Sequence, residues 1–310
     1  MIKYARRNRY FARLLRDMRV NWILYLLVLP AVVYVAIFCY GPMYGVTLAF
    51  KRYRIKEGIM GSQWVGLDYF ERFMRSHKFG ELMRNTLGIS VYSLLVGFPI
   101  PILLAVMLNY LRISWLKKTV QMVSYAPYFI SIVVMCGMIT IFFGETGPVN
   151  AVRTRMGLSG VAYLTDPTLF KSLYVWTGVW QGSGWSAIIY ISALSGVDYQ
   201  MHEAAIVDGA TKLQRIFHID LPAIKSTIIM LFIMAVGGLM GIGFDKAYLL
   251  QNPLNEPSSE IIATYVYKMG LIKSDYSLST AAGLYNTAIN LFLIVSANYI
   301  SKKLADESLF

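Results

Sequence analysis

The amino-acid sequence predicts an all-α protein that crosses a membrane several times. Of its 310 residues, 56% are hydrophobic and only 15% are charged, and the mean hydropathy is +0.52. A soluble domain spends about a quarter of its residues on charge, so this composition suits a chain whose main solvent is lipid. The same composition excludes intrinsic disorder, and two cysteines are too few for a disulfide-stapled secreted domain.

Six stretches of the chain are long and apolar enough to span a bilayer. A spanning helix needs about 20 mostly apolar residues. In lipid the backbone must satisfy its own hydrogen bonds, which runs of this length do as helices. The predicted spans are residues 22–40, 86–108, 119–143, 172–194, 224–244 and 280–300.

Several of these spans carry residues that predict their local shape. The first has no charge and is too long for the apolar part of a cleaved signal sequence, so we expect it to be retained. The second contains Pro99 and Pro101 and the third contains Pro127, which predict kinks. In the fifth, Gly237 and Gly241 have the spacing that permits close helix packing.

The N-terminal segment predicts the orientation of the chain. The first 20 residues carry seven basic side chains against one acid, Asp17, and this density favours a cytoplasmic N-terminus. Six spans would return the C-terminus to the cytoplasm. The predicted organisation is a basic cytoplasmic segment at 1–21, a six-helix transmembrane domain at 22–305 and a cytoplasmic tail at 306–310.

The net charge of +12 does not indicate nucleic-acid binding, because no zinc-finger spacing, RNP-like run or basic helix-turn-helix accompanies it. In the predicted topology, eight of the basic residues lie in the outer loop 51–84. This loop is an exception to the positive-inside pattern, and an interfacial helix is the one explanation that the sequence offers.

The motifs of several enzyme classes are missing from the sequence. There is no G-x-x-x-x-G-K-[ST] phosphate loop, so we expect no ATP hydrolysis by this chain, and there is no H-E-x-x-H or G-x-S-x-G motif. His77, His202 and His218 lack partners at metal-ligand spacing, so we expect no metal site. The predicted spans are almost free of ionisable residues, which argues against a proton-driven transporter and an intramembrane enzyme.

The segment 198–222, between the fourth and fifth predicted spans, is the most informative part of the chain. Asp198 can cap a helix start, Gly209 interrupts the helix, and a second helical piece follows until Pro222. Two short helices with a break on the cytoplasmic side are typical of an element that docks another protein. An ordinary interfacial loop is the alternative that the pattern leaves open.

The residues of this segment resemble the EAA motif of ABC importer permeases. Glu203, Gly209, Ile219 and the residues adjoining them stand at the family's spacing. In that family the segment forms the coupling helix, which sits in a groove of the ATPase. The resemblance implies that Glu203 makes a polar contact with the ATPase, that the two alanines allow close approach, and that Gly209 turns the chain. The implied coupling residues are Glu203, Ala204, Ala205, Asp208, Gly209, Ile219, Leu221 and Pro222.

Further matches look like the maltose-permease-like carbohydrate branch of the family, and within it the subgroup that imports polysaccharide-derived oligosaccharides. The resemblance covers roughly residues 20–305. The matching residues are Tyr125-Ala126-Pro127, Gly147 with Asn150, Trp180 through Tyr190, Asp208-Gly209-Ala210, Asn252-Pro253 and Thr264-Tyr265-Val266-Tyr267.

The resemblance implies a type I importer fold in the bacterial cytoplasmic membrane. The implied partners are a second homologous permease, an ATPase dimer that binds ATP and Mg, and an extracellular or periplasmic solute-binding protein. This chain itself would bind no cofactor. The basic N-terminal tail differs from the extended N-terminal region of the maltose permease, so that protein's ligand is not transferred.

A sugar path needs aromatic faces for stacking and amide or hydroxyl groups for hydrogen bonds. The third, fourth and sixth predicted spans supply both kinds of group. The alternative is structural, because aromatic residues also form interfacial belts and Asn also bridges helices. The candidate path residues are Tyr125, Tyr128, Trp180, Gln181, Trp185, Tyr190, Asn286 and Asn290.

The predicted function is that of a permease subunit that imports oligosaccharides with energy from a separate ATPase. Outer-loop cations, namely Arg153, Arg155 and Lys171, could attract uronate-containing sugars, or could be ordinary solvated charges. Import of another solute such as a peptide or polyol is the alternative within transport. An intramembrane enzyme or a receptor is the alternative outside it.

Overall fold

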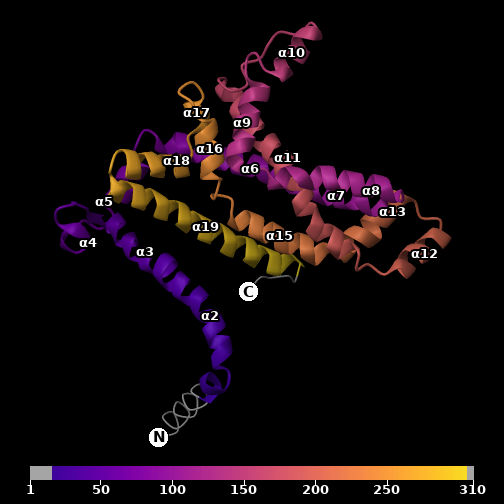
Figure 1. The fold of residues 1–310 in the computed structure, drawn as a ribbon, viewed down its shortest axis with the longest axis horizontal. Coiled ribbons are helices and arrows are strands. Elements are labelled where there is room, and N and C mark those ends of the chain that lie inside the picture. The colour runs from indigo at the N-terminus through magenta and orange to yellow at the C-terminus, as the bar shows by residue number, and fades with distance from the viewer. Residues whose placement is uncertain (1–15, 306–310) are drawn as a thin grey trace.

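The computed structural model describes residues 16–305, which are mostly helical. The predicted tail at 306–310 and most of the basic segment at 1–21 lie outside the described residues. Two long arms of packed helices run toward opposite ends of the molecule, and the N-terminal helix swings away from both (Figure 1). The all-α prediction holds, apart from one antiparallel pair of two-residue strands, β1 (Lys51–Arg52) and β2 (Gln63–Trp64).

The N-terminal helical stretch is apolar on every side. It comprises α2 (Trp22–Tyr34), a π-helical turn, α3 (Gly41–Met43) and a 3₁₀ segment that ends at Phe50. None of the residues of α2 is buried. The continuous helical stretch Trp22–Phe50, of 29 residues, is long and apolar enough to cross a membrane. A helix that is hydrophobic all round needs lipid or a protein partner around it.

The first arm gathers around α19 (Tyr276–Ala305), which packs against α5 (Asp68–Met74), α15 (Lys225–Gly237) and α18 (Ile262–Tyr267). Its core includes the fully buried Phe73, Leu82 and Ile262. The short helix α4 (Gly58–Gly61) flanks this arm, whereas α16 (Phe244–Leu250) and α17 (Glu256–Ser259) connect it to the second arm and pack mainly against helices of that arm.

The second arm is built on α11 (Pro167–Leu194), which packs against α6 (Phe79–Gly97), α7 (Pro99–Tyr110) and α8 (Ser114–Tyr125). The break between α6 and α7 falls at the predicted proline kink. The arm carries α9 (Ile132–Phe143) and α10 (Pro148–Arg155) at one end. At the other end it carries α12 (Tyr199–Val207), α13 (Lys212–Arg215) and α14 (Leu221–Ala223).

Judged by length and composition, fewer of the described helices could span a membrane than the six predicted. Within residues 16–305, four helical stretches qualify: 22–50, 79–110, 132–155 and 276–303. A fifth qualifies if Lys212–Ala223 and Lys225–Gly237, which meet at 66°, are one bent span. The predicted fourth span corresponds to α11, whose 28 residues are rich in Trp, Gly, Ser and Thr and therefore less apolar.

Two predicted spans are wrong as continuous helices. Residues 119–143 divide into α8, a 3₁₀ turn at Ala126–Phe129 and α9, because Pro127 and the extended Ile130 and Ser131 stop the helix. The fifth span ends as a helix at Gly237, and residues 238–243 are irregular. Gly237 does meet Ile294 closely on α19, as predicted for helix packing, whereas Gly241 lies in the irregular stretch.

Ion pairs account for half of the basic outer loop. Arg54, Arg72, Arg75 and Lys78 each lie within 4.0 Å of a carboxylate. The best-buried partner is Glu260, which is 2% exposed and contacts Lys78 at 2.5 Å and Lys268 at 3.0 Å. Arg54 and Arg75 pair with acids of the loop itself, whereas Arg72 and Lys78 pair with acids from a distant part of the chain, which the loop sequence alone does not reveal.

Candidate coupling segment and central cavity

The segment 198–222 folds as the capping residues predict. The Asp198 carboxylate accepts a hydrogen bond from the backbone N–H of Gln200 at 2.9 Å and begins α12. Gly209 has a φ of +77°, a left-handed conformation that glycine adopts without a steric penalty. Thr211 and Gln214 then form a capping box that begins α13. The helix–turn–helix form of the loop is thus set by local residues.

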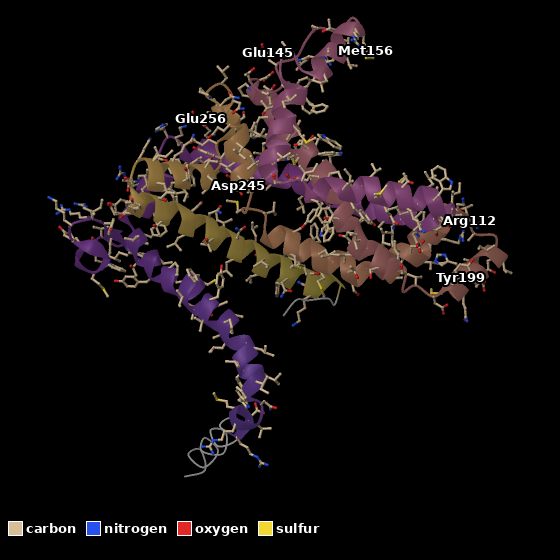
Figure 2. The ribbon with its side chains drawn as sticks, viewed as in Figure 1. Arg112, Glu145, Met156, Tyr199, Asp245 and Glu256 are labelled. Carbon is tan, nitrogen blue, oxygen red and sulfur yellow. The ribbon has the colours of Figure 1, made fainter. Side chains whose placement is uncertain are left out.

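The predicted coupling residues on and just after α12 are mostly exposed, whereas those that precede α15 are more buried. Glu203, Ala204, Asp208 and Gly209 are exposed, with Ala205 partly buried, and no residue of α12 is buried. Ile219 is buried, Leu221 is half-buried and Pro222 is exposed. The neighbouring Val207 is 87% exposed. The exposed group lies at one extremity of the molecule, where Tyr199 marks the start of α12 (Figure 2).

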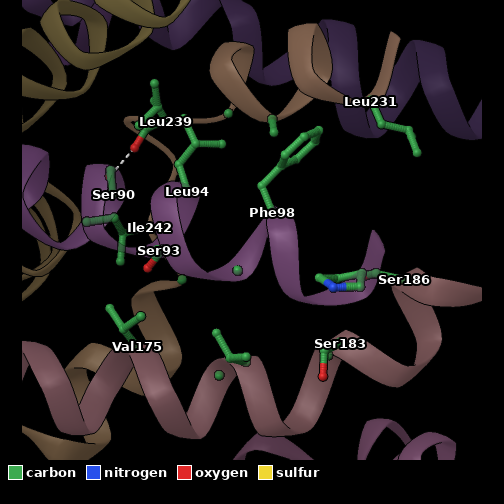
Figure 3. A pocket seen from close by; sticks show the side chains of 18 of the residues that line it. Ser90, Ser93, Leu94, Phe98, Val175, Ser183, Ser186, Leu231, Leu239 and Ile242 are labelled. Atoms are coloured by element: carbon green, nitrogen blue, oxygen red, sulfur yellow. Dashed lines mark hydrogen bonds between the residues drawn. The ribbon is translucent and has the colours of Figure 1, made fainter. Parts of the chain in front are cut away.

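A cavity of about 560 Å³ lies between α6, α7, α11, α15 and the irregular residues that follow α15 (Figure 3). Two predicted path residues, Trp185 and Tyr190, line it. Four serines from α6 and α11 give it hydroxyl groups, and the glycines of the irregular stretch leave backbone groups near its surface. These residues are Ser90, Ser93, Ser183, Ser186, Gly238, Gly241 and Gly243.

The irregular stretch that borders the cavity is held by side chains from other helices. Asn290 Oδ1 accepts a hydrogen bond from the backbone N–H of Met240 at 2.9 Å, and Asn286 Nδ2 donates to the Met240 carbonyl at 3.1 Å. The Ser90 hydroxyl donates to the carbonyl of Leu239. Non-helical backbone at membrane depth is tolerated where protein or a cavity surrounds it. Asn286 and Asn290, both predicted to line the sugar path, therefore make the structural contacts between segments that were the alternative interpretation of these residues.

Three aromatic side chains form a cluster beside the cavity, here called the aromatic shelf: Tyr128, Phe129 and Trp185. The rings of Tyr128 and Trp185 are stacked, with centroids 4.6 Å apart and planes 5° apart. Phe129 meets Trp185 edge-on at 5.6 Å. All three are exposed, and Trp185 belongs to both the shelf and the cavity wall.

The remaining path candidates have other surroundings. Gln181 donates a hydrogen bond from Nε2 to the carbonyl of Ile130 at 2.9 Å, which the break between α8 and α9 leaves free. Tyr125 is half-buried at the end of α8, and Trp180 is 50% exposed outside the cavity lining. Lys171, expected in an outer loop, lies on α11 and donates to the carbonyl of Arg84 at 3.4 Å.

Lys246 on α16 is a site residue that the sequence reasoning missed. Its side chain is almost fully buried, and Nζ donates to the Tyr174 carbonyl at 2.7 Å and lies 4.6 Å from the centre of the Tyr174 ring. Tyr174 and Gly178 both line the cavity, and a Cβ added to Gly178 would lie 3.2 Å from Nζ. The ammonium group is therefore directly behind the cavity wall.

Within the part of the chain that the structure describes, Lys246 has no ion-pair partner. Among the described residues, no carboxylate lies within 4.0 Å of Nζ. Burial lowers the pKa of Lys246 to about 8, so the side chain remains mostly protonated at neutral pH. A buried charge without a counter-ion is costly, and its only sequence signal is a lysine beside an apolar run.

Comparison with known proteins decides the family. The model of the binding-protein-dependent transport system inner membrane component family matches residues 97–306. The chain belongs to this family. It is a membrane-embedded permease subunit of an ABC importer and not an enzyme, as the EAA resemblance implied.

Two related proteins align with this permease over nearly its whole length. It is 41% identical to Protein LplB of Bacillus subtilis over 97% of this chain and 94% of that protein. It is 38% identical to the polygalacturonan/rhamnogalacturonan transport system permease protein YteP of the same organism, over 100% of this chain and 96% of that one.

Solved structures give the same fold. The permease matches a chain of a bacterial ABC transporter involved in the import of the acidic polysaccharide alginate, with a TM-score of 0.87 and 36% identity. The match covers 94% of this chain and 99% of the other. A second match, with a TM-score of 0.88, is to the bacterial alginate transporter in complex with an alginate pentasaccharide-bound periplasmic protein. These matches confirm the predicted importer-permease fold.

Proposed function

We propose that this permease forms half of the membrane pathway of an ABC importer for acidic, uronate-containing oligosaccharides. The proposal that the imported sugars are acidic rests on the buried Lys246 behind the wall of the central cavity, which has no carboxylate partner among the described residues. Two relatives, whose names specify polygalacturonan and an acidic polysaccharide, support the same class.

The proposed assembly contains this chain, a homologous second permease, an ATPase dimer and a solute-binding protein outside the membrane. ATP and Mg bind to the ATPase, because this sequence has no phosphate loop. The chain crosses the cytoplasmic membrane several times with both termini in the cytoplasm, as the basic N-terminal residues favour.

The exposed face of α12 is the proposed contact with the ATPase. Glu203 supplies charge there, Ala204 and Ala205 leave room for close approach, and Gly209 turns the chain into α13. When ATP closes the ATPase dimer, the coupling segments of the two permeases are drawn together and the cavity turns outward. This is a rigid-body movement of the kind that switches many proteins between two states.

Within the pathway, we assign separate roles to the aromatic shelf and the cavity. A sugar ring stacks on the exposed faces of Tyr128 and Trp185, as apolar sugar faces do on aromatic rings. The serine hydroxyls then bind sugar hydroxyl groups in the cavity. The protonated Lys246 attracts a uronate carboxylate through the thin wall at Gly178.

The experiment compares uptake of a galacturonate trisaccharide with uptake of the neutral galactose trisaccharide by the reconstituted complex. Lys246→Met keeps the length of the side chain and removes its charge. We expect uptake of the acidic sugar to fall about tenfold relative to the neutral sugar, equivalent to roughly 1.4 kcal/mol. Lys273→Met, at an exposed lysine, is the matched control and should change neither rate.

Equal losses for both sugars in Lys246→Met would contradict the acidic class and leave Lys246 with a packing role. Failure of the wild-type complex to import either sugar would contradict oligosaccharide import itself.

A further inference from the structure

A buried carboxylate lies where the coupling segment returns to the membrane domain. Asp220 has no solvent exposure and ends the π-helical turn Ile216–Asp220 that leads into α14 and α15. Its Oδ2 accepts a hydrogen bond from the hydroxyl of Tyr110, the last residue of α7, at 2.7 Å. Its Oδ1 lies 3.3 Å from Nε2 of His202 on α12. One side chain therefore joins three elements.

The groups around this buried carboxylate form a small cluster of half-buried side chains. The Tyr110 ring meets the His202 ring edge-on, with centroids 6.4 Å apart and planes at 79°. The guanidinium carbon of Arg215 lies 5.6 Å from the centre of the Tyr110 ring. Among residues 16–305, the buried Arg215 Nε has no hydrogen-bond partner, and Asp220 Oδ1 accepts no hydrogen bond although His202 is within ion-pair distance. The hydrogen-bonding capacity of the cluster is thus only partly used, and these two atoms can still form hydrogen bonds.

The position of the cluster matters because α12 is otherwise loosely held. No residue of α12 is buried, and glycines at 196 and 209 stand on either side of it. A displacement of α12 would bend the chain at these two connections unless a side chain of α12 contacts the membrane domain and transmits the displacement to it. His202, whose side chain is 12% exposed, provides such a contact on the inner face of α12, opposite the proposed ATPase surface.

We propose that Asp220 is a positioning residue that fastens the coupling helix to the end of α7 and to the turn that leads through α14 into α15. Through His202 and Tyr110 it makes a displacement of α12 move both helices together, so that ATP-driven movement reaches the cavity that these helices line. The inference rests on the proposed coupling role of α12 and names the side chains inside the permease that transmit it. Neighbouring polar groups in a low-dielectric environment strengthen one another, so loss of one partner weakens the contacts of the others.

The test measures sugar uptake and ATP hydrolysis together in the reconstituted complex, with and without sugar-loaded binding protein. Asp220→Asn removes the charge with little change of shape, and His202→Gln removes the partner on α12. We expect both variants to hydrolyse ATP at nearly the wild-type basal rate while uptake per ATP falls about 5- to 150-fold, the usual range for coupling between two sites. Tyr110→Phe should lower the ratio in the same direction.

His218→Gln is the matched control, because His218 is exposed and its Nδ1 lies 2.9 Å from the carbonyl of Gln214 in its own turn. It should keep the wild-type ratio. If Asp220→Asn does not assemble, His202→Gln and Tyr110→Phe decide the question, since both retain the carboxylate. An unchanged ratio in these variants, or parallel loss of hydrolysis and uptake, would overturn the inference. A wild-type complex whose hydrolysis does not respond to the loaded binding protein would instead contradict the proposed function.

Discussion

Gly209 and Gly157 form a matched pair for testing the turn in the coupling segment. Both have a φ of +77°, and a Cβ added at either position would meet no atom within 4 Å. Alanine at either position therefore causes no clash but must adopt the left-handed region, at roughly 1–2 kcal/mol. Gly157 follows α10, at a different extremity of the molecule from α12 (Figure 1).

The two substitutions should separate strain from function. The coupling segment is exposed, so Gly209→Ala is free to relax to another turn, and binding to the ATPase must then restore the original one. The cost of about 1–2 kcal/mol corresponds to a 5- to 30-fold loss of affinity. A titration of the solubilised permease pair with the ATPase measures this loss. Gly157→Ala carries the same strain and should bind with wild-type affinity.

Asparagine sharpens the comparison, because it tolerates the left-handed region better than alanine does. Gly209→Asn should therefore recover much of the affinity. If Gly209→Ala and Gly157→Ala both bind as the wild type does, the left-handed turn is not needed for the ATPase contact and the reasoning is refuted.

Two further predictions concern packing and charge. In Gly184→Ala, the new Cβ would overlap the carbonyl of Ser124 on α8, so we expect a lower melting temperature in detergent from overpacking worth about 1–3 kcal/mol. Gly182→Ala, with nothing within 4 Å, is its control, and equal melting temperatures would contradict the close approach of the helices. Uptake of the acidic trisaccharide should decline as the pH rises through about 8, where Lys246 loses its proton. Uptake of the neutral sugar should not follow this profile, and a constant preference across that range would exclude Lys246 as the source.

The coupling segment could be predicted in detail because its signals are local. Asp198 caps the residue two positions away, and Thr211 and Gln214 cap one another across three. The turn at Gly209 is closed by local hydrogen bonds, from the backbone N–H of Gly209 to the Ile206 carbonyl and from that of Ala210 to the Ala205 carbonyl. The ATPase-contact roles of its residues stay predictions, since they concern a surface between two chains.

The cavity was less predictable because its walls depend on distant parts of the sequence. The helix breaks at Pro127 and after Gly237 follow from the local sequence only in part, and Gln181 and Asn290 supply hydrogen bonds to the freed backbone from other helices. Hydropathy therefore located the apolar stretches but overestimated their continuity. Trp185 and Tyr190 do line the cavity, whereas Trp180, chosen by the same reasoning, does not.

The sequence by itself determined the membrane environment, the helical class, the local helix–turn–helix form of residues 198–222 and the importer family. Each of these depends on composition or on residues close together in the chain. Only the tertiary structure decided that Lys246 and Asp220 are buried. Tyr110 and Asp220 are 110 residues apart in the chain, and nothing in a linear pattern distinguishes a buried charge from a solvated one. The free energy of a charged side chain is set by its surroundings, and those exist only once the helices have packed.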